Sequence, residues 1–358
     1  MPDIIDQQEI IEQFSQIVRE AGRTGRPLRI QGSGSKSFYG RAMQGEMLDM
    51  TPYRGIVSYE PTELVLTARA GTPLAEIEAA LAAKRQMLPF EPPHLGSGAT
   101  LGGCIAAGLS GPRRAYTGAV RDYVLGVRML DGNGEDLKFG GQVMKNVAGY
   151  DVSRLMVGSM GTLGLLLEVS LKVLPLPVEE LTLRFEMAEA EALDKMNRWA
   201  AQPLSLSATC WHGGALTVRL SGASAAVNSV RQKLGGEEVK DADIFWRGVR
   251  EQQHAYFASA KMLWRLSLPS TTASVAVPGQ QLIEWGGAQR WLTSDASPER
   301  VRQAAVALGG HAILFRSPVQ ADAPFQPLPA PLLAVHQRLK QHFDPHHIFN
   351  PGRMYAEI

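Results

Sequence analysis

The chain has 358 residues and a mass of 38.9 kDa, which is long for one ordinary domain, so we expect two domains. With 45% hydrophobic and 20% charged residues it can bury a sizeable core, which excludes global disorder. The 36 Lys and Arg residues balance the 35 Asp and Glu residues to a net charge of +1, which excludes a general basic field for nucleic acid or an anionic membrane.

Two cysteines, Cys104 and Cys210, lie far apart and outside any Cys-x-x-Cys pair. They exclude a disulfide scaffold, a cysteine zinc site and an iron–sulfur cluster ligated by this chain alone. The first six residues lack the basic-then-apolar order of a signal peptide, and no apolar run is long enough to span a membrane. We therefore expect a soluble, cytoplasmic protein of a reducing compartment.

The first half of the chain predicts short strands and helices in alternation. Residues 7–21 place Ile10, Ile11 and Phe14 on one helical face, with Asp6 as the N-cap. Thr72 and Pro73 predict a cap and a first-turn proline for a helix that ends near residue 83. Strands are expected at residues 28–30, 56–59 and 64–68.

Glycine is concentrated in the next part of the chain. Of the 36 glycines, 16 lie between Gly96 and Gly164. A mostly apolar run over residues 165–174 follows and ends in Pro175 and Pro177, where we place the first domain boundary.

The second half mingles strands and helices with short links, which is typical of an antiparallel sheet covered on one face. Its two parts of similar size favour a ferredoxin-like cap. The Pro-rich stretch 322–331 then leads to an amphipathic helix over residues 332–343. The expected elements are strands at 181–185, 205–211, 215–220, 263–268, 281–285 and 312–315, and helices at 188–201, 223–234 and 298–308.

Three glycine loops are candidates for binding a ligand. The first, residues 32–37 after a strand, has Ser37 where a dinucleotide-binding fingerprint needs its third glycine, so it is no Rossmann motif. Its glycines, serines and Lys36 still suit a phosphate, although alone they also fit an ordinary tight turn. The second loop, residues 96–111, is rich in small residues, and the third is residues 158–164. Three such loops in one domain favour a cradle for an extended dinucleotide.

The order of these residues resembles flavoproteins with a vanillyl-alcohol-oxidase-type (PCMH) FAD domain. The similarity is carried by Gly32–Ser37, Tyr59–Thr62, Ala99–Gly103, Gly118 with Arg121-Asp122, Gly158–Gly164 and Asn350–Arg353. Within that family, the chain is similar over its full length to the FAD-binding E subunits of bacterial glycolate oxidases. The longer strings behind that similarity are Gln86–Pro89, Glu91–His94, Lys145–Asp151, Trp285–Gly287 and Asn350–Glu357.

The resemblance implies an α+β fold with a PCMH-type FAD-binding domain (1–177), a ferredoxin-like α/β cap (178–330) and a C-terminal segment that returns to the FAD domain (331–358). It implies that loop 32–37 and the turn at residues 100–103 hold the pyrophosphate of FAD, that residues 158–165 meet the adenine and ribose, and that Asn350 approaches the flavin. The implied cofactor-binding residues are Gly32, Ser33, Gly34, Ser35, Lys36, Ser37, Thr100, Leu101, Gly102, Gly103, Ser110, Gly111, Gly118, Gly158, Gly161, Thr162, Gly164, Leu165 and Asn350.

Some relatives attach the flavin through a His or Cys in these loops. No His lies in residues 31–38, and Cys104 is more simply explained as a small packed residue. We therefore expect FAD to be bound non-covalently.

Oxidation of a 2-hydroxy acid needs a cation for the carboxylate and a base for the hydroxyl proton. Each candidate also has an ordinary packing or surface role. The catalytic FAD subunits that this chain resembles carry a His-x-Gly-Asp-Gly-Asn-x-His motif, which is missing here, and Asp131–Asn133 predicts only a hairpin turn. No catalytic residue is therefore assigned. The candidates are Arg265 and Arg290 for the cation and His94, His212 and His311 for the base.

The function of two further clusters of charged or titratable residues stays open. The C-terminal histidines have no acidic or cysteine partner at a ligand-like spacing, so we predict no metal site among them. The arginines beside the second loop fit phosphate neutralisation and ordinary surface charge equally well. These clusters are His336, His342, His346 and His347, and Arg113, Arg114 and Arg121.

The resemblance implies an FAD-binding subunit of a glycolate oxidase complex that converts glycolate to glyoxylate, with electrons passing through flavin to an iron–sulfur partner. A catalytic FAD subunit and an iron–sulfur subunit are the implied partners, and the inner membrane would be reached only through them. Two alternatives stay open. The chain could be a self-sufficient FAD-dependent 2-hydroxy-acid dehydrogenase, or an assembly subunit whose FAD has no redox role.

Overall fold

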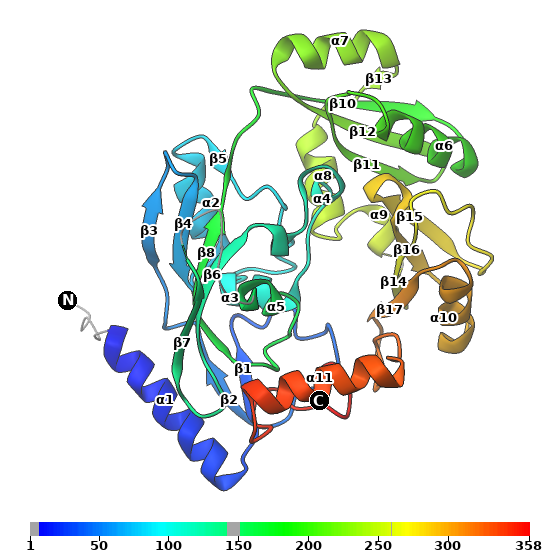
Figure 1. Cartoon of the computed structure of the whole chain (residues 1–358). Helices are drawn as coiled ribbons and strands as arrows, with labels where there is room; N and C mark the ends of the chain where they lie inside the picture. Colours follow the sequence, from blue (N-terminus) through cyan, green and yellow to red (C-terminus); the bar gives the residue numbers. More distant parts are fainter. Residues whose placement is uncertain (1–6, 142–150, 259) are drawn as a thin grey trace.

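The computed structural model describes residues 7–141, 151–258 and 260–358. Figure 1 shows two halves side by side, each built around its own sheet, with the last helix running along the base of both. The expected Asp6 cap and residues 145–150 of the family string lie outside the described residues.

The first half is built on a five-stranded antiparallel sheet in the order β3–β4–β8–β6–β7. Its central strand, β8, is buried along most of its length, because other strands flank both of its edges and both of its faces are covered. This burial explains the mostly apolar run predicted at residues 165–174. A separate parallel pair, β1 and β2, precedes it. The strands are β1 (Leu28–Gln31), β2 (Glu46–Asp49), β3 (Ile56–Glu60), β4 (Val65–Arg69), β6 (Val124–Leu130), β7 (Asp136–Gly140), β8 (Leu165–Lys172) and the short pair β5 (Gln86–Met87) and β9 (Leu174–Pro175).

Helices pack against this sheet and form one hydrophobic core with it. The predicted cap of the second helix is wrong: Pro73 is the N-cap residue, and the Thr72 hydroxyl accepts a hydrogen bond from Gly55 N at 2.8 Å instead. The helical elements are α1 (Gln7–Thr24), α2 (Leu74–Ala82), α3 (Leu101–Ala107), α4 (Arg114–Thr117), a 3-10 turn (Val120–Asp122) and α5 (Val152–Leu155).

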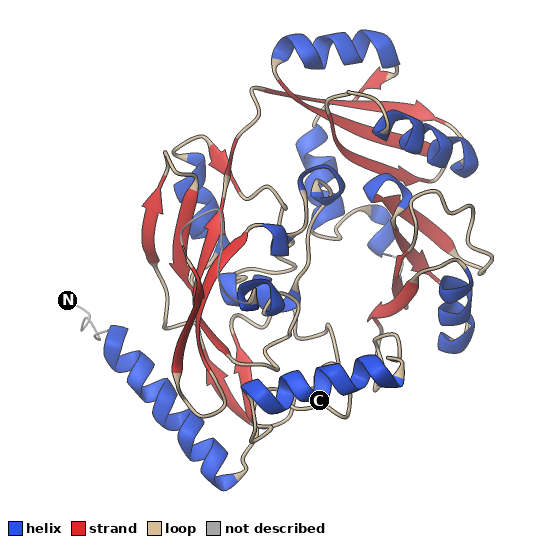
Figure 2. Cartoon of the chain, in the orientation of Figure 1, coloured by secondary structure: helices blue, strands red, loops and turns tan. Residues whose placement is uncertain are grey.

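The second half is built on an eight-stranded antiparallel sheet, with helices packed against it (Figure 2). Its order is β13–β10–β12–β11–β15–β16–β14–β17, so each four-stranded part has the order 4-1-3-2 of a ferredoxin-like unit. The two parts join at β11 and β15.

The elements of this half are β10 (Glu179–Glu186), α6 (Glu189–Ala200), β11 (Leu206–His212), β12 (Ala215–Gly222), α7 (Ser224–Leu234), β13 (Glu237–Glu238), α8 (Ala242–Arg250), α9 (Ala255–Ala258), β14 (Leu263–Ser267), β15 (Gln280–Glu284), a 3-10 turn (Trp285–Gly287), β16 (Gln289–Thr293), α10 (Pro298–Ala307) and β17 (His311–Arg316). The predicted strands and helices of this half agree with the structure to within a few residues, whereas β13, α8, α9 and β16 were not predicted.

The C-terminal segment returns to the first half through α11 (Ala330–Phe343). Phe343, Ile348 and Phe349 are buried in the core that residues 10–173 form. A fully buried ion pair holds the turn after the helix: Lys340 Nζ lies 2.7 Å from Asp344 Oδ2 and donates to the carbonyls of Thr162 (2.8 Å) and Phe349 (2.7 Å).

The α+β class is confirmed. The chain leaves one sheet at Lys172 and enters the other at Glu179, and we retain 1–177, 178–330 and 331–358 as a proposed division. Among the helices of the described residues, none has the length and apolar composition to cross a membrane.

Candidate functional site

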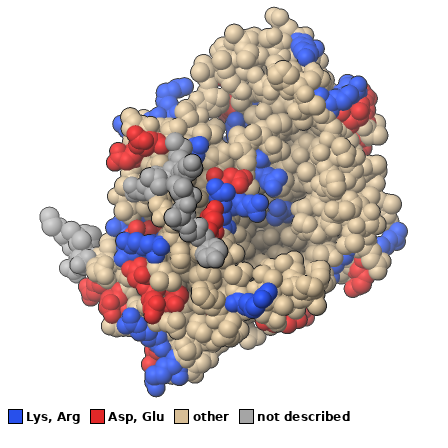
Figure 3. Space-filling model, in the orientation of Figure 1, with Lys and Arg blue, Asp and Glu red and all other residues tan. Residues whose placement is uncertain are grey.

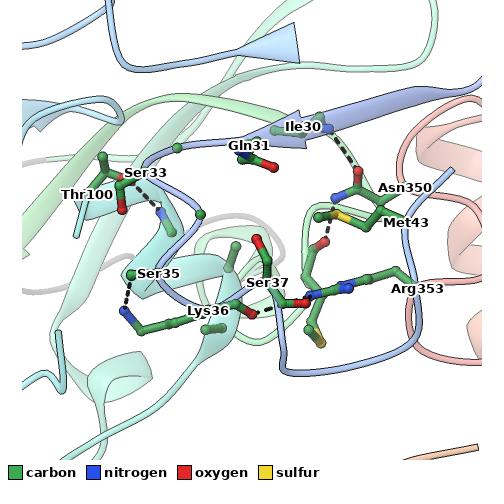
Figure 4. Close-up of a pocket in the computed structure, with 16 residues that line it drawn as sticks. Ile30, Gln31, Ser33, Ser35, Lys36, Ser37, Met43, Thr100, Asn350 and Arg353 are labelled. Carbon is green, nitrogen blue, oxygen red and sulfur yellow. Dashed lines mark hydrogen bonds between the residues drawn. The ribbon is translucent and has the colours of Figure 1, made fainter. Parts of the chain in front are cut away.

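The loop after β1, residues 32–37, forms one wall of a cavity that is open to solvent (Figure 4). Gly34 has a φ of +77°, which favours glycine. In the described part of the chain, the backbone N–H groups of residues 33–36 have no hydrogen-bond acceptor. Successive free N–H groups in a tight turn are a recurrent binding site for phosphate oxygens.

The second predicted segment, residues 100–103, faces the same cavity, but the amides of residues 101–103 are already hydrogen-bonded inside the protein. The Thr100 hydroxyl accepts a hydrogen bond from Gly103 N at 3.2 Å. Leu101 N and Gly102 N donate to the carbonyls of Thr72 (2.9 Å) and Ala70 (2.7 Å). This turn therefore contributes shape rather than hydrogen bonds, and a Cβ on Gly32 would lie only 2.3 Å from Thr100 Oγ1.

The third segment, which contains Gly158 and Gly161, is fastened to α3. Gly158 N and Met160 N donate to the carbonyls of Ile105 and Ala106, both at 2.9 Å. Gly161 has a φ of +72° and, together with Gly164, lines a second cavity. The two cavities adjoin, because both are lined by residues such as Gly32, Thr100 and Asn350.

Asn350 joins β1, the strand that leads into the first loop, to the third loop. Its side-chain Oδ1 accepts a hydrogen bond from Ile30 N, and its Nδ2 donates to the Met160 carbonyl, both at 2.8 Å. The residue is 3% exposed, so both amide atoms are used inside the protein. Asn350 therefore fixes the end of β1 and the third loop relative to each other beside the cavity.

Arg353 has a role that sequence reasoning missed. The side chain is buried, lines the first cavity and donates to the backbone carbonyls of Ser37 (3.2 Å), Tyr39 and Arg41. Burial lowers its pKa to about 10. Its place in the closing family string was the available signal, but its partners lie more than 300 residues away in the chain.

Several predicted residues lie elsewhere. Ser110 and Gly111 line a separate small cavity between the two halves, and Gly158 and Thr162 line one beneath α11. Three predicted residues line none of these cavities: Leu101 and Leu165 are fully buried, and Gly118 ends α4.

Lys36 and Cys104 are both largely withdrawn from solvent near the cavity. Lys36 Nζ donates to the His94 carbonyl at 3.1 Å, and burial lowers its pKa. Burial raises the pKa of the Cys104 thiol to about 12, so this thiol stays protonated at neutral pH.

Most candidates for substrate chemistry have internal partners. Arg290 is fully buried and donates to the carbonyls of Ala273 (2.8 Å) and Thr272. His212 Nδ1 lies 3.1 Å from the Gln281 carbonyl, and His311 is exposed at the start of β17.

Arg265 and His94 also have side-chain partners. Arg265 lines the cavity that contains Ser110, and its Nε donates to Gln289 Oε1 at 2.9 Å. His94 Nε2 lies 3.2 Å from Glu78 Oε2. Among the described residues, no group of three or more His, Cys, Asp or Glu side chains could hold a metal ion.

Comparisons with known proteins agree with this geometry. A family model described as "FAD binding domain" matches residues 2–140. The solved structure of an alkyldihydroxyacetonephosphate synthase shares the fold, with a TM-score of 0.66 at 15% sequence identity over 95% of this chain and 74% of that one. The predicted fold class, with a PCMH-type FAD-binding domain, is therefore confirmed.

Curated relatives narrow the class. The chain is 52% identical to the glycolate oxidase subunit GlcE of Escherichia coli (strain K12), over 98% of each chain. It is also 31% identical to the glycolate oxidase subunit GlcD of Bacillus subtilis (strain 168) over 185 residues, which are 51% of this chain and 39% of that protein. The chain belongs to the family of glycolate oxidase subunit GlcE, and the predicted family is confirmed.

Proposed function

We propose that this chain binds FAD non-covalently as one subunit of a glycolate oxidase complex. The observation that carries the proposal is the meeting of three loops at two adjoining cavities, one loop with free N–H groups and two with glycines. This arrangement suits a long, flat ligand with a phosphate group at its middle.

The described residues fit FAD in a definite way. The N–H groups of residues 33–36 would hold the pyrophosphate, while Gly103, Gly161 and Gly164 would let the ligand lie against backbone. When bound, FAD would supply reversible two-electron chemistry. The buried, protonated Cys104 thiol is not available as a flavin linkage, which favours non-covalent binding.

The partners follow from what this chain lacks. Arg290 is used by backbone carbonyls, and neither His212 nor His311 lines the FAD cavities. We therefore assign the oxidation of glycolate to glyoxylate to the complex, with a catalytic FAD subunit as one partner. Both cysteines of the chain are buried and single, so a cluster-borne step would belong to an iron–sulfur subunit. That subunit would also provide the route to a membrane acceptor.

FAD binding is tested on the purified chain. We expect a yellow protein that releases all of its flavin as free FAD on acid precipitation. A Gly103→Glu variant should take up no flavin, because its side chain would fill the cavity. An Ala226→Glu variant, on the exposed face of α7 in the other half, is the control and should bind FAD normally. A colourless wild-type chain that takes up no added FAD would disprove the proposal.

The role of the flavin is tested with glycolate. If the chain works only within the complex, its flavin stays oxidised when the purified chain meets glycolate and is reduced when the partners are added. Bleaching in the chain alone would instead support a self-sufficient dehydrogenase, the alternative that the position of Arg265 in the inter-half cavity favours. A flavin that stays oxidised throughout turnover of the complex would support a purely structural role.

A further inference from the structure

The first glycine loop, residues 32–37 (the cofactor loop), packs against residues 94–98, which form its supporting segment. A Cβ on Gly96 would lie 3.1 Å from the Cβ of Ser35, and one on Gly98 would lie 3.6 Å from that of Ser33. Lys36 Nζ donates to the His94 carbonyl at 3.1 Å. The position of the 32–37 loop therefore depends on the conformation of residues 94–98.

This supporting segment is not in a relaxed conformation. Leu95 has a φ of +53°, in the left-handed region that residues with a side chain rarely adopt. Gly98 follows with a φ of +74°. A residue in such a conformation keeps it only when its surroundings hold it there.

The holding group comes from the second half of the molecule. Glu251, the residue directly after α8, accepts hydrogen bonds on Oε2 from His94 N (3.0 Å) and Leu95 N (2.8 Å). Its other oxygen accepts from Arg250 Nε at 2.7 Å, and its side chain is only 10% exposed. A buried carboxylate on two adjacent N–H groups makes strong, charge-assisted bonds.

We propose that Glu251 is a positioning residue for the cofactor loop, although it does not line the FAD cavities. Its carboxylate fixes the turn at residues 94–95. That turn presents the His94 carbonyl to Lys36 and the two glycines to the serines of the loop. The inference rests on FAD binding at this site and adds that the eight-stranded half takes part in it from a distance. By thermodynamic reciprocity, bound FAD also strengthens the contact made by Glu251.

The test compares three variants of the full chain by flavin-fluorescence titration with FAD. Glu251→Ala removes both acceptors and should weaken FAD binding about tenfold or more, the scale of losing hydrogen bonds to a charged group. Glu251→Gln keeps one acceptor oxygen and should recover part of the affinity. Glu180→Ala is the matched control. It breaks an ion pair between the same two halves, to Arg113 at 2.6 Å, and should change the affinity less than about twofold.

A second measurement needs no cofactor. In the FAD-free chain, Glu251→Ala should speed hydrogen exchange of amides in residues 32–37 and 94–98, and Glu180→Ala should not. A wild-type chain that binds no FAD would refute the proposed function. A wild-type chain that binds FAD, with Glu251→Ala binding it equally tightly or Glu180→Ala weakening it equally, would refute only the positioning role.

Discussion

Replacing Lys340 by Met should destabilise the first half of the molecule and weaken its hold on FAD. The side chain of Lys340 is fully buried, as is that of Asp344, its ion-pair partner at 2.7 Å. The carboxylate also accepts hydrogen bonds from Ile348 N (3.1 Å) and Phe349 N (2.8 Å). Met has nearly the volume of Lys, so the change removes the charge and its hydrogen bonds without opening a large cavity.

The size of the effect follows from the groups left behind. Without the ammonium group, the Asp344 carboxylate is a buried charge with no cation, and the carbonyls of Thr162 and Phe349 lose a donor. Breaking a buried ion pair from one side costs about 3–5 kcal/mol. That is a large share of the roughly 5–15 kcal/mol that stabilises a typical domain. Because Asn350 follows this turn and joins β1, which leads into the first loop, to the third loop, FAD affinity should fall as well.

Urea unfolding of the full chain, followed by circular dichroism, measures the loss as a lower midpoint. Lys233→Met is the control, because that exposed ammonium group only meets Gln202 on the surface, and it should change stability by less than about 0.5 kcal/mol. An unfolding midpoint for Lys340→Met that equals the wild-type value would show that the buried pair does not hold this segment.

Three further predictions concern single residues. Gly32→Ala should reduce FAD affinity at least tenfold in a fluorescence titration, because the new Cβ would lie 2.3 Å from Thr100 Oγ1. A variant that binds FAD as tightly as the wild type would contradict this tight contact. Burial raises the pKa of Glu284 to about 7 from the ordinary 4.5, so the folded chain binds this proton more tightly than the unfolded chain. The contribution of Glu284 to stability is complete below about pH 4.5 and is lost as the pH rises through 7, by about 3 kcal/mol in all. Glu284→Gln should therefore flatten this part of a plot of urea midpoint against pH. An unchanged slope in the variant would refute the raised pKa. Cys104, with a buried thiol and a pKa of about 12, should resist iodoacetamide at pH 8 in the native chain and react only after unfolding, as mass spectrometry would show.

Local patterns were enough to predict most secondary structure. The apolar run at residues 165–174 corresponds to β8 and β9, and the amphipathic pattern at 332–343 lies within α11. The cap of α2 was missed because the Thr72 hydroxyl bonds to Gly55, a partner that comes from tertiary folding. Patterns that span only a few residues could therefore be interpreted from the sequence. The hydrogen bond of a distant backbone group to the Thr72 hydroxyl could not.

The candidate site shows the same limit. Glycine loops pointed to the cavities, and residues 32–37 and 103 line them. The sequence did not show that the amides of residues 101–103 are already hydrogen-bonded inside the protein, and only the fold does. Asn350 and Arg353 bind loops more than 180 residues away in the chain. Glu251, in the second half, accepts hydrogen bonds from residues 94–95 of the first half. Figure 3 shows the hollow between the two halves. No spacing along the chain encodes such contacts.

The return of the C-terminal segment has a consequence for biosynthesis. The core of residues 10–173 is completed by Phe343, Ile348 and Phe349, and Asn350 joins β1 to the third loop. A ribosome releases the N-terminal part long before these residues emerge. The cofactor site can therefore form only after nearly all of the chain has been made. Loading with FAD becomes a late event, and a chain cut short before Lys340 would be left without a completed site.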